Sequence, residues 1–291
     1  MKAVLIVLSF ILFGRACAQE KPIYVLKNRY DQHVNEVINN SPIDFREIRI
    51  LVNYQIVDAN NSSAIDYKRV QSWVEKFFPN KSDEGILCVN LENKFYNDLK
   101  NNGTKDYKTA NKEFVTLLNF IKDFRPNVEI GIWGLPFPLS DERMDPIFNA
   151  SDIIFPSCYI PAPAEVSGIK ANYEFIDRKM NEAFDFADRL NKKVIPFFWY
   201  LVHGPDKDLR FERLSKEEML KYIKYVENYR SANQSEIFGV AWWDTPTPYN
   251  SNRIKDNFRK SERSAIRALS TRKVIDEKST IDDTFLYYFD F

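Results

Sequence analysis

The sequence has little glycine, few histidines and no excess of either charge. Only 8 of its 291 residues are glycine, two are histidine and three are cysteine, and 41 basic residues balance 41 acidic ones. This balance gives no basic surface for nucleic acid or an anionic membrane, so we expect neither as a partner. Two histidines and cysteines without metal-ligand spacing predict no metal site, and no glycine-rich phosphate loop is present. We therefore expect no metal and no organic cofactor.

The first residues have the pattern of a secretory signal peptide. Lys2 precedes the apolar run 4–13, which is too short to span a bilayer, and a small-x-small motif follows at 16–18. We expect residues 1–18 to be removed and the protein to be secreted or extracellular. In a bacterium it would be periplasmic, or a surface lipoprotein acylated at Cys17. Seven Asn-x-Ser/Thr sequons favour a glycoprotein. No later segment is apolar enough for membrane insertion, and we expect a monomer.

Most of the remaining chain alternates between short apolar runs and longer amphipathic patterns. The runs are rich in Ile, Val and Phe and continuously apolar, which is typical of strands buried on both faces of a parallel sheet. They lie at 23–28, 48–57, 86–92, 129–135, 153–160, 194–201 and 238–243. Helical spacing occurs between or after them, at 66–78, 114–121, 175–190, 219–229 and 253–268. Ser215 and Glu218 have the spacing of a capping box.

These repeated strand–helix units predict an α/β fold, and specifically a single distorted (β/α) TIM-type barrel of about seven parallel strands. An open doubly wound sheet has the same periodicity and stays an alternative. No linker rich in proline, glycine or serine divides the chain, so we expect one catalytic domain over 19–270 and a C-terminal tail over 271–291. The last residues, 284–291, are aromatic and strand-like.

Polar and aromatic side chains end several of the predicted strands. In a (β/α) barrel the active site lies at the carboxyl ends of the strands. Glu92 ends one strand, and Asn90 shares its face because side chains alternate along a strand. The other strand-end candidates are Trp133, Tyr159, Trp199, Tyr200, Trp243 and Asp244. Flat aromatic rings beside carboxylates suit the apolar faces of sugars, so we expect a polysaccharide or other glycan as substrate.

A carboxylate in this position favours glycoside hydrolysis, with Glu92 as the acid. Glycosidases usually need two carboxylates, and Asp244 is the second candidate, which would make a retaining enzyme. Another route uses one acid and lets the substrate act as its own nucleophile. A catalytically silent carbohydrate-binding barrel is the remaining alternative.

Several segments resemble the hyaluronidases of venoms and animal tissues, a family of glycoside hydrolases that cleave β-N-acetylhexosaminide bonds. Residues 85–92 are similar to the family's acid strand, G-V-x-D-x-E, and residues 193–200 are close to its K-V-L-P-Y-Y-W-Y segment. Residues 131–136, 155–159 and 239–244 resemble its G-Y-Y-x-x-P, L-P-S-x-Y and G-x-x-x-W-G motifs. The matches occur in the family's order along the chain.

The resemblance implies a distorted seven-stranded barrel and an endo-acting enzyme for an N-acetylhexosamine-containing polysaccharide. It matches Glu92 to the proton donor, Tyr159 to a substrate-contacting tyrosine and Trp243 to a pocket tryptophan. Where the family has an aspartate that orients the substrate acetamide, this chain has Asn90. We thus expect Glu92, Asn90 and Tyr159 to be catalytic, and Trp133, Trp199, Tyr200, Trp243 and Asp244 to bind substrate.

Two cysteines lie inside the predicted strands. If Cys88 faces the interior with Asn90 and Glu92, then Cys158, which precedes an inward-facing Tyr159, must face the helices. The two side chains would diverge and could not meet the geometry of a disulfide. We therefore expect two free, buried thiols.

Overall fold

The computed structural model describes residues 21–58, 61, 64–101, 104–135, 142–243 and 285–289. The expected signal peptide, the expected helix at 253–268 and Asp244 lie outside the described residues. The strands are β1 (Ile23–Val25), β2 (Phe45–Glu47), β3 (Arg49–Val52), β4 (Gly85–Asn90), β5 (Val128–Trp133), β6 (Ile153–Phe155), β7 (Lys193–Val194), β8 (Phe197–Trp199) and β9 (Val240–Trp243). The helices are α1 (Gln32–Asn40), α2 (Asn53–Ile56), α3 (Tyr67–Phe77), α4 (Lys94–Asp98), α5 (Lys105–Phe124), α6 (Asp145–Ala150), α7 (Ala164–Ser167), α8 (Ile169–Leu190) and α9 (Lys216–Glu227), with 3-10 turns η1 (Lys27–Arg29) and η2 (Glu142–Met144).

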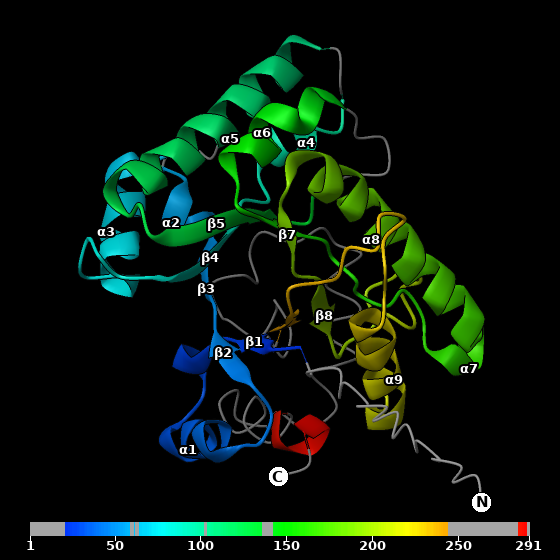
Figure 1. The fold of residues 1–291 in the computed structure, drawn as a ribbon. Helices are drawn as coiled ribbons and strands as arrows, with labels where there is room; N and C mark the ends of the chain where they lie inside the picture. Colours follow the sequence, from blue (N-terminus) through cyan, green and yellow to red (C-terminus); the bar gives the residue numbers. More distant parts are fainter. Residues whose placement is uncertain are drawn as a thin grey trace, which may run out of the picture.

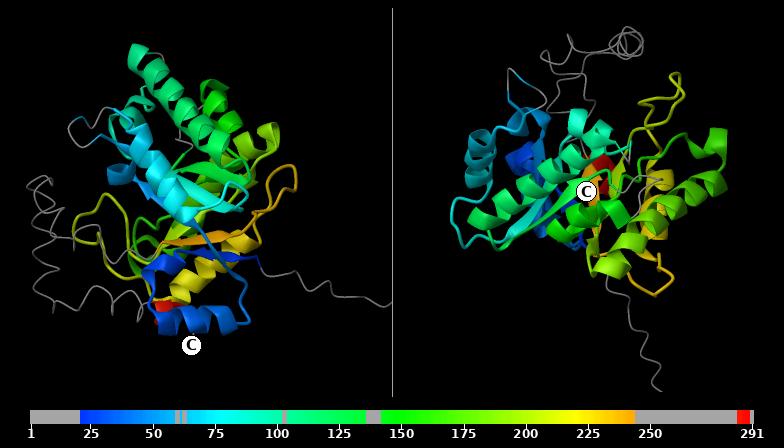
Figure 2. Two further views of the ribbon diagram at one scale, coloured as in Figure 1. Left: turned by 90° about the vertical axis from the view of Figure 1, so that its left-hand side faces the viewer. Right: turned by 90° about the horizontal axis from the view of Figure 1, so that it is seen from above.

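The named strands form two parallel sheets, with helices around the outside (Figure 1). One sheet has the order β2-β1-β9-β8 and the other the order β3-β4-β5-β6-β7. Two chain segments link them, because only Ile48 separates β2 from β3 and only Ile195 and Pro196 separate β7 from β8. A parallel bridge between Ser157 and Phe197 joins them again. Figure 2 shows the same inner strands and outer helices from two further sides.

The predicted α/β class is confirmed, but the strand count differs from the expected seven. The described chain has nine strands in two sheets. The run 194–201 divides at Pro196, which has no N–H to donate to a neighbouring strand. The short, largely exposed β2 was not expected. The run 48–57 leaves its strand at Val52, whose N–H donates to the Gln55 side chain (2.9 Å) as α2 begins.

The helices turn their apolar faces toward the strands, as the spacing of apolar residues predicts. α5 packs on β5, α3 on β3, and α8 on β6 and β7. In α5, Phe114, Leu118 and Ile121 are fully buried. The helix α1 was not expected, because Val34 and Ile38 are its only buried residues.

The expected capping box before α9 forms only in part. The Ser215 hydroxyl accepts a hydrogen bond from the Glu218 N–H (3.1 Å), as predicted. The Glu218 carboxylate instead accepts from the Ala164 N–H (2.8 Å) and the Tyr222 hydroxyl (2.6 Å). Glu218 thereby ties the start of α7 to α9.

Residues 285–289 are helical, so the expected strand-like end is wrong for this stretch. The Tyr288 ring lies 5.2 Å from the Trp242 ring and 5.7 Å from the Tyr200 ring, and its hydroxyl donates to the Leu214 carbonyl. Phe285 is also fully buried. This part of the expected tail completes the core beside β8 and β9.

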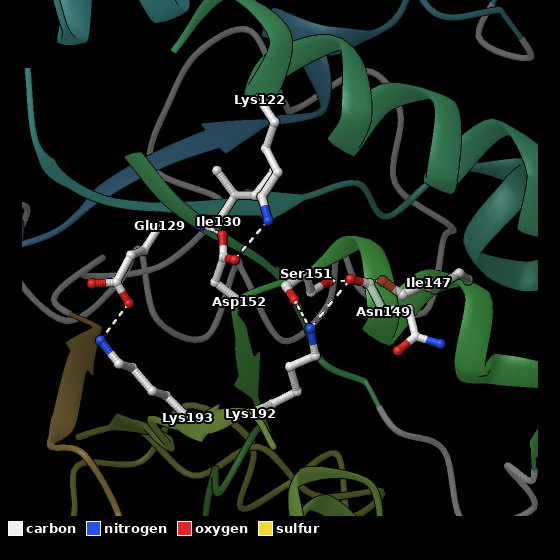
Figure 3. Close-up of polar contacts among 9 residues, drawn as sticks. All are labelled: Lys122, Glu129, Ile130, Ile147, Asn149, Ser151, Asp152, Lys192 and Lys193. Atoms are coloured by element: carbon white, nitrogen blue, oxygen red, sulfur yellow. Dashed lines mark hydrogen bonds and ion pairs between the residues drawn. The ribbon is translucent and has the colours of Figure 1, made fainter. Parts of the chain in front are cut away.

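The amino ends of β5, β6 and β7 carry a group of polar contacts (Figure 3). Asp152 pairs with Lys122 (2.6 Å) and accepts from the Ile130 N–H (2.9 Å). Glu129 pairs with Lys193 (2.5 Å). These contacts lie at the amino ends of the strands, the edge opposite to Glu92.

Cys88 and Cys158 are both free and buried, which confirms the expected pair of thiols. The Cys158 sulfur lies 3.9 Å from the Met180 sulfur on α8, so its side chain faces the helices. Burial raises the pKa of Cys158 to about 12, and raises the pKa of Cys88 as well. Both groups therefore stay in the thiol form.

Candidate active site

The carboxyl ends of the strands meet at one edge of the sheets, because all the described pairings between named strands are parallel. The register aligns Val52 with Asn90 across β3 and β4. It also aligns Trp199 with Trp243 across β8 and β9. Four of the residues predicted to form the site therefore end strands at this edge, namely Asn90, Trp133, Trp199 and Trp243.

The backbone at Glu92 is fixed from several directions. β4 ends two residues before it, and α4 begins two residues after it. Asn93 caps α4, with its side-chain oxygen accepting from the Phe95 N–H (2.9 Å). The Asn53 side-chain amide, at the start of α2, donates to the Glu92 carbonyl (2.9 Å). These contacts fix the backbone from which the Glu92 side chain projects.

The Glu92 side chain is solvent-accessible, yet the protein surrounding it raises the pKa of its carboxyl. Desolvation is the largest influence on this pKa, and a hydrogen bond from Asn90 and the positive charge of Lys100 oppose it. A carboxyl that holds its proton above the usual pH range and can be reached from solvent is suited to general acid catalysis.

Asn90 contacts the acid through its side chain. Its amide donates a hydrogen bond to the Glu92 carboxylate, which lowers the pKa of Glu92. The side-chain oxygen of Asn90 is buried and has no hydrogen-bond partner among the described residues. Such an unpaired oxygen costs about 1–3 kcal/mol, so it is a candidate acceptor for a bound ligand.

Tyr96 on α4 is a site residue that the sequence reasoning missed. Its hydroxyl donates to the Gly134 carbonyl (3.3 Å), and burial followed by the charge of Glu92 raises the pKa of Tyr96. Gly134 has a φ of +78°, and a Cβ at this position would lie 2.8 Å from the Tyr96 hydroxyl. The sequence shows a glycine at position 134, but no local pattern indicates that Tyr96 is its partner.

An aromatic cluster, made of Trp133, Tyr159, Trp199 and His203, lies near the acid. The Tyr159 ring centroid lies 5.8 Å from that of Trp133 and 5.5 Å from that of Trp199. Burial raises the pKa of Tyr159 far above its usual value, and the charge of Glu92 adds to this rise. The Tyr159 phenol thus stays protonated and lies within electrostatic reach of Glu92.

His203 was noted in the sequence only as one of two histidines. Its ring lies 5.7 Å from Tyr159 and 5.8 Å from Trp199, and the residue is exposed. Desolvation by the surrounding protein, followed by the charge of Arg210, lowers the pKa of His203. The imidazole is therefore neutral at neutral pH and can both donate and accept a hydrogen bond. No motif identifies it, since it lies in a loop after β8.

Trp243 lies at the end of β9 beside a cation. The Arg29 guanidinium, from η1, lies 4.9 Å from the centre of the Trp243 ring. The same arginine lowers the pKa of Tyr159, which opposes the effect of burial. Arg29 was not predicted, because it follows the first strand without a recognisable motif.

Tyr200 does not join the aromatic cluster, and its position argues against the predicted substrate contact. Its ring is buried 6.0 Å from the Trp242 ring, with the planes nearly parallel. Adjacent residues at a strand end point to opposite faces, so Tyr200 faces away when Trp199 faces Tyr159. The described residues thus bring Glu92 and Asn90 close to Tyr159 and its neighbours, and leave Tyr200 in the core.

No group of three or more His, Cys, Asp or Glu side chains in the described ranges could hold a metal ion. Within the same ranges, no helix is both long and apolar enough to cross a membrane.

The fold belongs to the class of α/β proteins with parallel inner strands and outer helices. Among solved structures, the chain is similar to bee venom hyaluronidase, with a TM-score of 0.56 and 15% identity over 91% of this chain and 100% of that chain. A structure of bee venom hyaluronidase in complex with a hyaluronic acid tetramer matches with a TM-score of 0.51 and 15% identity, over 85% and 98% of the two chains. The predicted resemblance to hyaluronidases is confirmed at the level of the fold. No family model and no curated protein sequence matches the chain.

Proposed function

We propose that the protein is a secreted glycoside hydrolase that cleaves within an N-acetylhexosamine-containing polysaccharide. The observation that carries this proposal is the accessible Glu92 carboxyl, with its raised pKa, near the aromatic cluster. The similar bee venom hyaluronidase in complex with a hyaluronic acid tetramer supports a glycan substrate. The chain links at Ile48 and Pro196 support the view that both sheets act together as one distorted barrel.

In the proposed reaction, Glu92 donates its proton to the glycosidic oxygen as the bond from that oxygen to the anomeric carbon breaks. The acetamide oxygen of the substrate attacks the anomeric carbon from the opposite face and forms a cyclic intermediate, while the leaving sugar departs as an alcohol. Water then opens the ring, and the Glu92 carboxylate takes up the proton that water loses. The two displacements together retain the anomeric configuration.

Asn90 and Tyr159 would position the acetamide. The unpaired side-chain oxygen of Asn90 is an acceptor for the acetamide N–H. The raised pKa of Tyr159 keeps its hydroxyl protonated, so that it can donate to the acetamide oxygen or to the intermediate. Trp133, Trp199 and Trp243 would pack against the apolar faces of the sugar rings.

The cations near these groups support an acidic polysaccharide. The positive charge of Lys100 lowers the pKa of Glu92, and that of Arg210 lowers the pKa of His203. Arg29 lowers the pKa of Tyr159 and packs over the Trp243 ring. Although the net charge of the whole chain is balanced, three cations therefore contribute positive charge at the candidate site. Uronate-containing polymers such as hyaluronan fit this charge.

A panel of hyaluronan, chondroitin and chitin tests the proposal, with release of reducing ends as the readout. The unchanged protein should cleave at least one polymer, and Glu92→Gln should lower the rate by roughly 10²–10⁴-fold. Binding without release of reducing ends would instead establish a catalytically silent carbohydrate-binding protein.

The alternative is a retaining glycosidase in which Glu92 is the acid and Asp244, which directly follows Trp243 at the end of β9, is the nucleophile in place of the substrate acetamide. In that case Asp244→Asn should abolish turnover as completely as Glu92→Gln. The substrate-assisted route predicts that Asp244→Asn keeps activity on N-acetylated polymers. A chemically de-acetylated polymer also separates the two routes. The substrate-assisted route predicts no turnover of this polymer, because it needs the acetamide, whereas the route through Asp244 predicts turnover.

Secretion has its own test. The protein recovered from the culture medium of an expressing cell should begin at Gln19, because residues 1–18 would be removed. A product that stays inside the cell with Lys2 still present would contradict it.

A further inference from the structure

The segment that directly follows β3 lies beside the acid. The Asn53 side chain donates to the Glu92 carbonyl (2.9 Å), which joins the start of α2 to the chain at Glu92. Tyr54 is the next residue, and it is 64% exposed. The Arg69 guanidinium on α3 donates to the carbonyls of Tyr54 (3.3 Å) and Val57 (2.7 Å), so the backbone that carries the Tyr54 ring is fixed.

The Tyr54 ring begins a row of aromatic side chains that runs onto α3. It meets the Trp73 ring edge to face, with 6.2 Å between centroids and an interplanar angle of 86°. The Trp73 ring lies 5.8 Å from that of Phe77. The Lys76 ammonium lies 4.6 Å from the centre of the Trp73 ring. The row therefore combines an exposed ring, that of Tyr54, with a cation beside the neighbouring Trp73 ring.

We propose that Tyr54 and Trp73 form an outer subsite that binds a sugar ring of the same glycan chain whose bond Glu92 cleaves. This inference rests on the function proposed above. The occupant is a pyranose of an acidic polysaccharide, since the exposed Tyr54 face suits the apolar face of a sugar and Lys76 suits a uronate carboxylate. The hydrogen bond from the Asn53 side chain to the Glu92 carbonyl joins the segment that carries Tyr54 to the chain at the candidate acid.

An outer subsite adds binding energy only for a glycan that is long enough to reach it. Loss of the Tyr54 ring should therefore weaken the binding of a polymer and leave a short oligosaccharide unaffected. A residue needed for the folding of the site would weaken the binding of both. The dependence on chain length separates the two explanations.

The experiment uses the full chain carrying Glu92→Gln, so that binding is measured without turnover. The probes are high-molecular-mass hyaluronan and a hyaluronan tetrasaccharide, and calorimetry gives the affinity per site. Adding Tyr54→Ala should weaken polymer binding by about tenfold, the order expected for one aromatic contact, and leave tetrasaccharide binding unchanged. Tyr54→Phe keeps the ring and should bind as the parent does.

Phe238→Ala is the matched control, because Phe238 is an exposed aromatic residue that precedes β9 at the opposite edge of the sheet. It should leave the binding of both probes unchanged. Equal polymer binding by the parent and by Tyr54→Ala would overturn the outer subsite and leave the proposed function intact. A parent that binds neither probe would exclude hyaluronan as the glycan of the proposed function, and would overturn the outer subsite for this polymer.

Discussion

Asn90 donates a side-chain hydrogen bond to the carboxylate of Glu92, two residues further along the chain. The bond stabilises the charged form of Glu92 and so opposes the desolvation that raises the pKa of this group. The pKa of Glu92 thus depends on the balance between desolvation, which raises it, and the hydrogen bond from Asn90, which lowers it. Changes at position 90 should move the pH profile in a known direction.

Asn90→Asp should shift the alkaline limb of the kcat profile to higher pH. The substitution replaces a donor with a like charge, and both changes raise the pKa of Glu92, so the acid stays protonated at higher pH. Asn90→Ala removes the donor without adding a charge, so it should give a smaller shift in the same direction. The measurement is kcat against pH for all three proteins, and an unchanged alkaline limb in Asn90→Asp would show that Glu92 is not the titrating acid.

Glu92→Gln should be at least as stable as the unchanged protein at pH 7. The pKa of Glu92 is raised in the folded state, so the charged form is disfavoured there relative to the unfolded chain. Stability from this group is greatest below its unfolded pKa of about 4.3 and falls as pH rises through the folded pKa. Melting temperatures of the two proteins should therefore converge in acid. A Glu92→Gln protein that is less stable than the parent at neutral pH but not in acid would show that the folded state favours the charged form of Glu92.

Tyr159→Phe should lower kcat with little change in melting temperature, because it removes the hydroxyl and keeps the ring between Trp133 and Trp199. Tyr159→Ala removes the ring as well and should cost about 3–5 kcal/mol of unfolding free energy, as for other buried aromatic residues. Paired measurements of kcat and chemical unfolding separate the two effects. Full activity in Tyr159→Phe would remove the hydroxyl from the mechanism.

Asp152→Ala should destabilise the fold by about 1–3 kcal/mol and leave kcat unchanged, because it strips the buried Ile130 N–H of its acceptor at the edge opposite to the site. Glu129→Ala is the matched control. Both members of its ion pair with Lys193 are more than a third exposed, and such pairs contribute only about 0–1 kcal/mol. Urea unfolding of both variants measures the difference, and equal losses would contradict the role given to Asp152.

Cys88 and Cys158 should resist alkylation in the folded protein and react fully in denaturant without a reducing agent. Burial keeps both groups inaccessible and protonated, and the pKa of Cys158 is about 12. Peptide mapping after treatment with iodoacetamide should find an adduct at each position only after unfolding. Rapid modification of either cysteine in the native protein would show that this thiol becomes exposed to solvent without global unfolding.

The sequence predicted the candidate residues that lie at or just beyond strand ends. Trp133 ends β5 and Glu92 lies two residues beyond β4, both in continuous apolar runs, and a period of two tells which neighbours share a face. Tyr96, Arg29 and His203 come instead from a helix, a 3-10 turn and a loop. Their positions depend on tertiary contacts such as the hydrogen bond from Tyr96 to the Gly134 carbonyl, which no local pattern contains.

The same limit applies to the fold. The strand positions follow from the apolar composition of the runs. The division of 194–201 into two strands depends on Pro196, which counts as one more apolar residue in a continuous apolar run. Tyr200 was grouped with Trp199 because the two are adjacent, although alternation directs them to opposite faces. The role of residues 285–289 was hidden because five aromatic-rich residues fit a helix and a strand equally well.

The position of β1 between β2 and β9 has a consequence for how the chain is made. Ile23 pairs with Val240, so among the described residues the first strand completes its sheet only when the last strand is present. During synthesis, one edge of β1 stays without a partner until most of the chain has left the ribosome. Contacts of such long sequence separation slow folding, and an open strand edge invites pairing with other chains. We therefore expect the yield of recombinant protein to depend on how well the nascent chain is protected by chaperones.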